Sequence, residues 1–437
     1  MNTSQPSPPL DAASRLLTSL SQPTRLLVSV SGGSDSTGLL IALHQVTSQP
    51  DCPHSLTAAT VDHALRPDSA DEALAVARLC ASLEIPHRIL TWQGDKPRTG
   101  ISSTAREARY RLLADAAVAL DATAIVTGHT ADDQDETITM RAARADEDSI
   151  GLSGMASATL YDRRIWLLRP FLEVRRAAIR DYLTGQAVGW VDDPSNADRR
   201  FERVRVRQDR GAAMPGSADE AAARRRLLSK GAADLIAASA TLHAGCLITL
   251  SPAARNAEPA ILRHALTTLV AIVGGRPHRP ATAAMDRLMR LVTSGKPGRM
   301  TLARALVQCR RDGLYLMREI RDVLPRTLPP HSALLWDGRY RITNPTGEAL
   351  QIAPGTDLHP SPEADALSPA IRTHMARVSP QIRAVSALAG GSHAPPAHVT
   401  VEPAFPLFDR FLAETDLPLA DAVARLFGAR AYLPPPA

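Results

Sequence analysis

Cysteine and aromatic residues are scarce in this chain of 437 residues, and their scarcity excludes several kinds of site. No two cysteines form a Cys-x-x-Cys pair, which argues against a disulfide framework, a zinc site and a thiol relay. We therefore expect the cysteines to be small core residues. Aromatic residues make up 4% of the chain, so a platform for stacking bases is not evident. The cysteines are Cys52, Cys80, Cys246 and Cys309.

Long apolar runs are also missing. No run of apolar residues in the sequence is long enough to span a bilayer. Residues 1–9 are polar and proline-rich, with no basic segment followed by an apolar core, which predicts that they are not a signal peptide. We therefore expect a cytoplasmic protein that does not contact membranes. The length suits two or three domains, each able to bury a core.

Positive charge is in slight excess and is concentrated locally. The formal net charge is +5 and the pI is about 9.3. Clustered arginines suit the phosphate backbone of a nucleic acid, but a solvated helix face carries the same pattern, and charge alone does not decide between them. The clustered residues are Arg199, Arg200, Arg203, Arg205, Arg207 and Arg210, followed by Arg224, Arg225 and Arg226.

Strand-like and helical stretches alternate over the first part of the chain. Helical patterns such as 71–83 and 104–120 separate most of the apolar strand candidates. This alternation predicts an α/β fold with a doubly wound parallel sheet, whose ligand lies outside the carboxyl ends of the strands. The strand candidates are Leu26–Val30, Leu56–Val61, His87–Trp92, Ala124–Thr127 and Ile165–Leu168.

Changes in composition suggest the domain boundaries. A stretch rich in glycine, alanine, proline and serine around 211–219 precedes a largely helical region, which contains one candidate hairpin at 306–317. A second linker at 325–330 precedes a β-rich start at 336–342. We predict an N-terminal tail with a short helix, a catalytic domain, a helical domain and a smaller C-terminal α+β region, at 1–21, 22–212, 213–326 and 327–437.

A glycine-rich turn directly after the first strand candidate is the strongest chemical signal. Its glycines allow a sharp turn that brings backbone N–H groups close to an anion, and its serines add hydroxyl donors. No lysine follows, so this is not a Walker A loop, and the turn suits pyrophosphate held by backbone amides and Mg²⁺. The alternative is a surface turn. The sequence of the turn is Ser31-Gly32-Gly33-Ser34-Asp35-Ser36.

Two further motifs are ambiguous by themselves. Val61, Asp62 and His63 end the second strand candidate, where they can line a nucleotide cleft, although an Asp-His pair is more often a cap or a loop contact. Thr104 and a glutamate three residues later form a capping box, which predicts a helix start. The motif that contains Arg106 and Arg109 places both guanidiniums on one helix face, suited to phosphates or to solvent.

An acidic cluster follows the fourth strand candidate and opens a helix. Carboxylates in a first turn complement the helix dipole, but this density at the carboxyl end of a strand also suits Mg²⁺ on a triphosphate. The candidate residues are Gly128, His129, Asp132, Asp133 and Glu136. Beyond it come Gly-Leu-Ser-Gly-Met at 151–155, Arg-Pro at 169–170 and a Trp-Val-Asp-Asp-Pro-Ser-Asn run at 190–196.

In this order, the motifs resemble those of the tRNA(Ile)-lysidine synthetase family, within the PP-loop ATP pyrophosphatase superfamily. The resemblance is close over about residues 24–210 and looser to about 320. One departure is Val204, which stands where the family usually has asparagine, whereas Arg203 and Arg207 fit.

The resemblance implies a reaction and the residues that perform it. ATP adenylates the C2 oxygen of the wobble cytidine in an isoleucine tRNA with anticodon CAU, and L-lysine then displaces AMP to form lysidine, which reads AUA instead of AUG. Residues 31–36 would cradle the phosphates, residues 61–63 and Gly128 would lie by the nucleotide, and Asp35 with Asp132 or Asp133 would hold Mg²⁺.

The resemblance leaves other roles open. Arg106, Arg109 and His129 would face the α-phosphate, the cytidine or the tRNA, and Asp133 or Glu136 would accept a proton from lysine. The arginine cluster and the helical domain at 213–326 would bind tRNA. Dimers are common in the family, so a homodimer is an open alternative. The rival interpretations are another PP-loop enzyme acting on a different substrate, or a tRNA-binding protein without catalysis.

Overall fold

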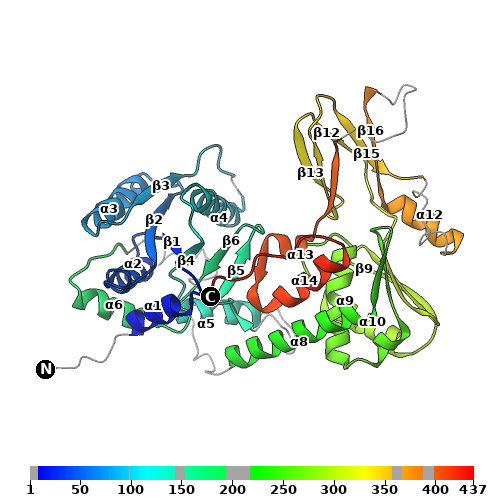
Figure 1. Ribbon diagram of the computed structural model, residues 1–437, viewed down its shortest axis with the longest axis horizontal. Helices are drawn as coiled ribbons and strands as arrows, with labels where there is room; N and C mark the ends of the chain where they lie inside the picture. Colours follow the sequence, from blue (N-terminus) through cyan, green and yellow to red (C-terminus); the bar gives the residue numbers. More distant parts are fainter. Residues whose placement is uncertain (1–7, 98, 143–152, 193–216, 357–366, 387–397) are drawn as a thin grey trace. The chain divides into compact units, whose positions relative to one another are not determined.

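A computed structural model describes residues 8–97, 99–142, 153–192, 217–356, 367–386 and 398–437 (Figure 1). The chain divides into two compact units: unit 1 holds residues 1–224 with 433–437, and unit 2 holds residues 225–432. The boundary at 224 falls inside one long helix. The predicted boundaries after 212 and 326 stay predictions. Among the described residues, no helix is both long and apolar enough to cross a membrane.

Unit 1 is an alternating α/β structure. Its helices are α1 (Pro8–Ser19), α2 (Ser34–Thr47), α3 (Ser69–Ser82), α4 (Ile101–Ala119), α5 (Ala131–Ala142) and α6 (Arg176–Gly185). Its strands are β1 (Arg25–Ser29), β2 (Ser55–Asp62), β3 (His87–Thr91), β4 (Ala124–Thr127), β5 (Ala158–Tyr161) and β6 (Ile165–Leu168).

The strands of unit 1 lie side by side in the order β5-β6-β4-β1-β2-β3. All neighbouring pairs from β6 to β3 are parallel, whereas β5 runs antiparallel to β6. The chain leaves β1 toward β2 and later returns to the other side of β1 with β4. The strand order therefore reverses between β1 and β4, which is where a doubly wound sheet binds its ligand.

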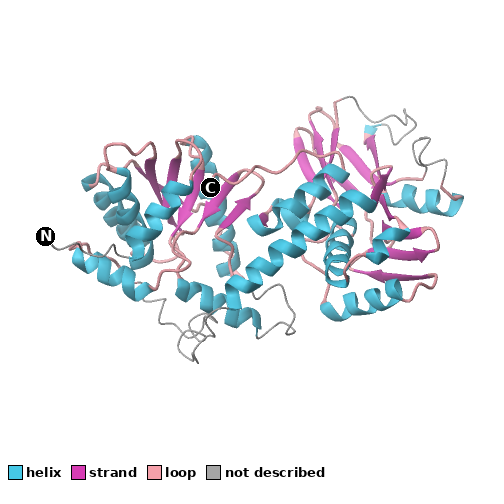
Figure 2. Cartoon of the chain, turned by 60° about the horizontal axis from the view of Figure 1, so that its bottom comes forward, coloured by secondary structure: helices cyan, strands magenta, loops and turns pink. Residues whose placement is uncertain are grey.

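Helices cover both faces of this sheet, and the side chains explain how closely they approach (Figures 1 and 2). On one face, Leu113 and Ala117 of α4 pack with Leu27 of β1 and Ile125 of β4 in a fully buried cluster. Helices α2 and α6 also contact each other. A Cβ on Gly38 would lie 2.3 Å from the Cγ2 of Ile179, so glycine permits the close packing of these two helices.

Unit 2 mixes helices with three small antiparallel sheets, whose strands are magenta in Figure 2. Its helical elements are the long α8 (Ser217–Ser239), which begins before the boundary, η3 (Pro252–Asn256), α9 (Pro259–Val273), α10 (Thr282–Thr293), α12 (Pro369–Val378), α13 (Pro406–Asp409), η5 (Glu414–Asp416) and α14 (Leu417–Leu426). Its strands are β7 (Ala240–His243), β8 (Leu247–Leu250), β9 (Gly298–Leu302), β10 (Ala305–Arg310), β11 (Gly313–Arg318), β12 (Arg326–Leu328), β13 (Ser332–Trp336), β14 (Tyr340–Asn344), β15 (Leu350–Pro354), β16 (Pro380–Ala384), β17 (Thr400–Pro403) and β18 (Phe411–Ala413).

A buried carboxylate helps to hold unit 2 together. The side chain of Asp337, in the turn between β13 and β14, is 2% exposed and accepts hydrogen bonds from Arg304, Arg318 and Arg339. The Nε atoms of Arg318 and Arg339 lie 3.1 and 2.7 Å from its Oδ2. Arg318 also donates to backbone carbonyls. Because buried guanidiniums need this many acceptors, the network is structural.

The five expected strands of the sheet are confirmed, but the sequence analysis missed one strand and was wrong in two details. The five expected strands of unit 1 correspond to β1, β2, β3, β4 and β6, and the hairpin at 306–317 is β10 with β11. Strand β5 was not expected. Helix α4 begins at Ile101 after Gly100, not at a Thr104 cap, because the Thr104 hydroxyl donates to the Gly100 carbonyl from inside the first turn.

The second wrong detail is the largely helical character assigned to residues 219–320. This region contains the five-stranded sheet β7-β8-β11-β10-β9 beside its helices. Short apolar runs such as those of β7 and β8 suit either a helix or a strand, and pairing with residues far along the chain decides between them. Among the cysteines, Cys80, Cys246 and Cys309 are buried as expected, whereas Cys52 is half-buried, and all four are free.

Candidate active site

The glycine-rich turn forms a tight loop between β1 and α2. Gly32 adopts a φ of +86°, which L side chains rarely adopt, and Gly33 is the N-cap residue of α2. The Ser36 hydroxyl accepts a hydrogen bond from the Ser31 N–H at 3.1 Å and lies 3.2 Å from the Gly33 carbonyl, to which it donates. No side chain caps the N-terminus of α2, so its N–H groups can receive an anion.

The end of β4 touches this loop directly. A Cβ on Gly128 would lie 2.8 Å from the carbonyl oxygen of Asp35 and 3.0 Å from the Cα of Ser36. Both are backbone atoms that cannot rotate away. Glycine at position 128 therefore allows the loops after β1 and β4 to meet at the point where the strand order reverses.

Three of the predicted site residues converge on one arginine that the sequence analysis did not single out. The Nε of Arg176 donates to the Oδ2 of Asp35 at 2.8 Å, and its Nη2 donates to the Oδ1 of Asp133 at 3.1 Å. The backbone N–H of Arg176, at the start of α6, donates to the Oδ2 of Asp132 at 2.9 Å. The structure thus brings the proposed metal ligands together around a guanidinium.

The acidic residues are held in different ways. Asp133 also accepts hydrogen bonds from the N–H and the hydroxyl of Thr130, at 2.9 and 3.0 Å. Burial raises the pKa of Asp35, and the neighbouring Arg176 only partly opposes that shift. Glu136 lies on the same helix as Asp133 but is only 2% exposed. Asp133 is therefore the more accessible of the two carboxylates proposed to accept the lysine proton.

His129 lies just before this acidic helix. Its Nδ1 is 2.9 Å from the hydroxyl of Thr127, the last residue of β4. This contact orients the imidazole at the carboxyl end of the strand, beside the proposed metal ligands in sequence.

A second cluster forms at the ends of β2 and β3. The Nη2 of Arg109 lies 3.4 Å from the Nε2 of His63, and the Trp92 ring packs edge-on against the imidazole with centroids 6.0 Å apart. Burial, reinforced by Arg109, lowers the pKa of His63 to about 4. Because a guanidinium only donates, neutral His63 carries its proton on Nδ1, for which the described residues provide no hydrogen-bond partner. Its neighbour Asp62 accepts from the N–H of Ala64 at 2.8 Å.

The Arg106 side chain does not point toward His63 as that of Arg109 does. Its guanidinium lies over the ring of Tyr110, 5.0 Å from the centroid, so the structure places it against its own helix. Val61 belongs to β2, next to the paired residue Leu90 of β3.

Gly154 and Met155 of the 151–155 motif contact Gln134 of the acidic helix α5. Gln134 receives the Met155 N–H on its Oε1 at 2.6 Å and donates from its Nε2 to the Met155 carbonyl at 3.0 Å. Gly154 adopts a φ of +63°, and a Cβ there would lie 2.5 Å from the Gln134 Oε1. Two motifs that are separate in sequence therefore form one piece of the site.

The arginines predicted to bind tRNA fall into two groups. Arg199, Arg200, Arg203, Arg205 and Arg207 lie outside the described residues, as does Val204. On α8, Arg225 donates to both oxygens of Asp416, at 3.0 and 2.6 Å, and Arg226 pairs with Glu414 at 2.8 Å. Arg224 of α8 is exposed. Arg225 is therefore engaged within unit 2, so its guanidinium is the least suited of these three to a tRNA contact.

Arg180, one helical turn after Arg176, is a further residue that the sequence analysis missed. Its Nε lies 3.5 Å from the Ser34 hydroxyl, and its Nη2 donates to Asp192 at 2.7 Å. Nearby, the N–H of Val191 donates to the Gly32 carbonyl at 2.9 Å. Two arginines spaced four apart just after Arg169-Pro170 were a signal, since that spacing puts both on one helix face.

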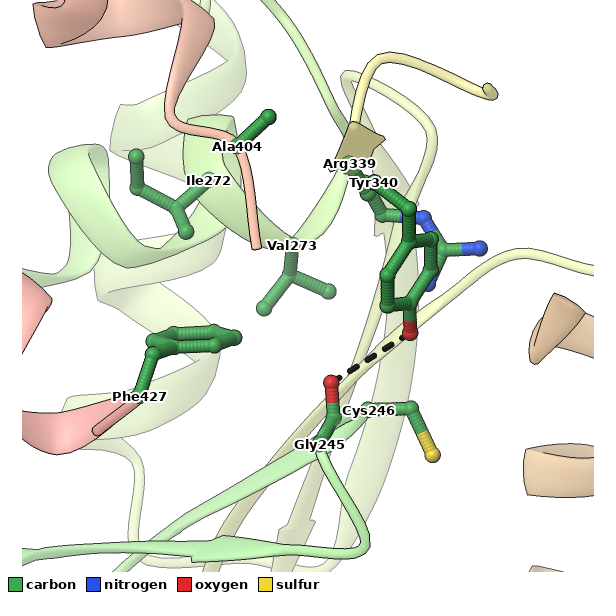
Figure 3. A pocket seen from close by; sticks show the side chains of 8 residues that line it. All are labelled: Gly245, Cys246, Ile272, Val273, Arg339, Tyr340, Ala404 and Phe427. Carbon is green, nitrogen blue, oxygen red and sulfur yellow. Dashed lines mark hydrogen bonds between the residues drawn. The ribbon is translucent and has the colours of Figure 1, made fainter. Parts of the chain in front are cut away.

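A pocket in unit 2 is lined by none of the residues predicted to bind ATP, metal or tRNA or to take part in catalysis (Figure 3). Its lining includes Cys246, Tyr340 and Phe427, and the Tyr340 hydroxyl donates to the Gly245 carbonyl at 3.3 Å. The volume is about 20 Å³, enough for about one water molecule. This pocket cannot take a nucleotide.

This site defines an ATP-binding protein of the PP-loop class, since it combines a parallel sheet, a glycine-rich loop at the switch point and facing carboxylates. The PP-loop domain family matches residues 10–211. A tRNA(Ile)-lysidine synthase from Rhizobium meliloti is 43% identical over 98% of this chain and 97% of its own length. Proteins of the same name from Mesorhizobium japonicum and Brucella canis are 42% and 36% identical, over 96% and 92% of this chain and 96% and 94% of theirs. The chain belongs to the tRNA(Ile)-lysidine synthase family.

Likeness to a solved structure is weak by comparison. The U34-tRNA thiolase NcsA from Methanococcus maripaludis aligns over 46% of this chain and 70% of its own, with 15% identity and a TM-score of 0.40.

Proposed function

We propose that this protein is an ATP-dependent ligase that joins L-lysine to C2 of the wobble cytidine in an isoleucine tRNA with anticodon CAU. The tRNA is adenylated on the C2 oxygen with release of pyrophosphate, and the ε-amine of lysine then displaces AMP. One observation carries the proposal: the phosphate loop, the end of β4 and three aspartates meet at the switch point of the sheet, in a chain of this family. The alternative of a different substrate for the same fold is not favoured.

The phosphate loop would bind the leaving pyrophosphate. The free N–H groups at the start of α2 and the hydroxyls of Ser31, Ser34 and Ser36 are donors that suit the β and γ phosphates. The Nδ1–H of His63 is not bound by any of the described residues and would offer a donor at the neighbouring strand end, where the adenosine would lie. Arg109 and His129 would face the α-phosphate or the cytidine.

The donor set at the switch point fits Mg²⁺. The described residues contain no group of three or more histidine, cysteine or acidic side chains placed to hold a metal ion by themselves. Asp35 with Asp133, which share the Arg176 guanidinium, or Asp35 with Asp132, would supply the one or two carboxylates that Mg²⁺ takes beside phosphate oxygens. Bound there, Mg²⁺ would neutralise charge on the departing pyrophosphate. Asp133 or Glu136 would first bind the lysine ammonium and then take its proton, because only the neutral amine attacks.

Other parts of the chain would recognise the tRNA. The arginine cluster at 199–207, together with Arg224 and Arg226, would contact the phosphate backbone, and unit 2 would contribute to the binding of the tRNA body. A homodimer and a cytoplasmic location remain part of this proposal.

The decisive experiment measures incorporation of labelled lysine into two transcripts, an isoleucine tRNA and a methionine tRNA that both carry CAU, with ATP and Mg²⁺. We expect label only in the isoleucine tRNA, and its loss when the wobble cytidine is changed. ATP turnover driven by another acceptor, with no label in either tRNA, would overturn the proposal.

A second experiment isolates the first half-reaction. We expect Asp35→Ala to abolish tRNA-dependent exchange of pyrophosphate into ATP, because the carboxylate lies at the phosphate loop. Full exchange in this variant would contradict the assignment of the loop.

A further inference from the structure

Arg176 contacts each of the three aspartates proposed as metal ligands. Its guanidinium bridges Asp35 and Asp133, and its backbone N–H is bound by Asp132. The side chains of Arg176 and Asp35 are each 20% exposed, and that of Asp133 is 19% exposed. The guanidinium therefore stands where a cation bound by these carboxylates would stand.

Charge explains why a cation is needed there even without a ligand. Two carboxylates brought together with little solvent repel each other, and a shared guanidinium offsets this repulsion. Mg²⁺ would perform the same neutralisation with two charges instead of one.

The anchoring of Arg176 lets its side chain move without its backbone. Asp132 holds the backbone N–H at the first turn of α6, and α6 packs on α2 through Ile179 and Gly38. Helix α2 begins at the phosphate loop itself. The Cα of Arg176 is thus fixed beside the loop, within reach of both the carboxylates and any phosphate bound there.

We propose that Arg176 is a phosphate-binding residue whose guanidinium neutralises Asp35 and Asp133, competes there with the divalent cation, and transfers to the phosphates when the cation arrives with ATP. This inference rests on the proposed function only in assigning the cation site. The proposal predicts that the metal binds more tightly together with ATP than by itself. The metal alone must displace the Arg176 guanidinium from the carboxylates when no phosphate is present to bind that guanidinium.

The test measures binding of Mn²⁺ alone, by titration calorimetry on the full-length protein without nucleotide or tRNA. We expect Arg176→Ala and Arg176→Gln to bind Mn²⁺ about tenfold or more tightly than the wild type, because the carboxylates lose their competitor. Arg176→Lys keeps the charge and should stay near the wild type. The two neutral variants should also melt at a lower temperature without metal, and Mn²⁺ should raise that temperature more than it does for the wild type.

Arg175→Ala is the matched control. Arg175 precedes Arg176 and carries the same charge, but its guanidinium pairs with Asp135 at 2.5 Å and acts on Asp132 only through its charge. We expect its Mn²⁺ affinity to be unchanged. In pyrophosphate exchange, Arg176→Gln should raise the KM for ATP about tenfold or more while Arg175→Ala does not.

The outcomes separate this inference from the proposed function. Folded Arg176→Gln protein that binds Mn²⁺ no more tightly than the wild type overturns the competition, even if the wild type forms lysidine. Tighter Mn²⁺ binding in a protein that forms no lysidine supports the role of Arg176 and refutes the substrate assignment alone.

Discussion

Replacing Gly128 with alanine tests whether the contact between β4 and the phosphate loop is essential. The added Cβ would lie 2.8 Å from the carbonyl oxygen and 2.9 Å from the carbonyl carbon of Asp35. Contacts of this length essentially never occur for a real Cβ, and ordinary van der Waals contact begins near 3.4 Å. Backbone must therefore move by about half an ångström or more, since a packed interior offers no free volume.

The expected losses follow from that displacement. Overpacking of this kind costs about 1–3 kcal/mol of stability. In a domain of this size, each kcal/mol lowers the melting temperature by about 2–4 °C. Activity should suffer more than stability, because a misplacement on the order of 1 Å in a positioned site can cost about 10²-fold in rate. We expect kcat/KM for ATP in pyrophosphate exchange to fall by about 10²-fold.

Gly185→Ala provides the control for this experiment. Gly185 ends α6, and an added Cβ there meets nothing within 4 Å. Alanine is favoured over glycine in helices by up to about 1 kcal/mol, so this variant should be as stable as the wild type or slightly more stable. Wild-type exchange kinetics in Gly128→Ala, measured beside this control, would refute the idea that close approach of the two loops builds the site.

Two further predictions concern buried charges in unit 2. Asp416 is 4% exposed, and although burial raises the pKa of its carboxylate, Arg225 and Arg279 lower that pKa to about 2. Asp416→Asn leaves both guanidiniums without this carboxylate and should lower the free energy of unfolding in urea by about 3 kcal/mol or more. An unchanged urea midpoint would contradict this prediction. His264 is 3% exposed, and its burial, aided by Arg279, lowers its pKa from 6.5 to about 4. Between pH 6.5 and pH 4 the unfolded chain therefore binds a proton at this histidine, whereas the folded protein does not. The free energy of unfolding should fall by up to about 3 kcal/mol as the pH drops over that interval. His264→Leu should flatten the pH dependence of the melting temperature below 6.5, and an identical pH profile for both proteins would contradict the assignment.

Local patterns predicted most of the catalytic unit. A buried parallel strand is a short continuous apolar run, and glycine directly after it marks a turn that few other residues can make. The strands β1, β2, β3, β4 and β6 and the loop at 31–36 were accordingly predictable. The antiparallel β5 was not, because its apolar residues at 158–161 become a strand only by pairing with β6.

The helical interpretation of 219–320 failed for a related reason. Strands β7 to β11 are each four to six residues long, and such runs carry no periodicity that separates a strand from a helix. Their partners are set by contacts along the sheet. Arg225 is a similar case, since the sequence presents it as one of three consecutive arginines, whereas the fold pairs it with a carboxylate 191 residues away.

The sequence alone determined which chemical groups the protein carries and near which strand ends they lie, because strands, glycine turns and helix starts depend on neighbouring residues. Only the tertiary structure decided which of these groups meet. Arg176 and Asp35 are 141 positions apart, and no local pattern relates them. They become partners because the packing of α6 on α2 and the missing Cβ of Gly128 bring three loops to one point at the carboxyl ends of the central strands β1 and β4.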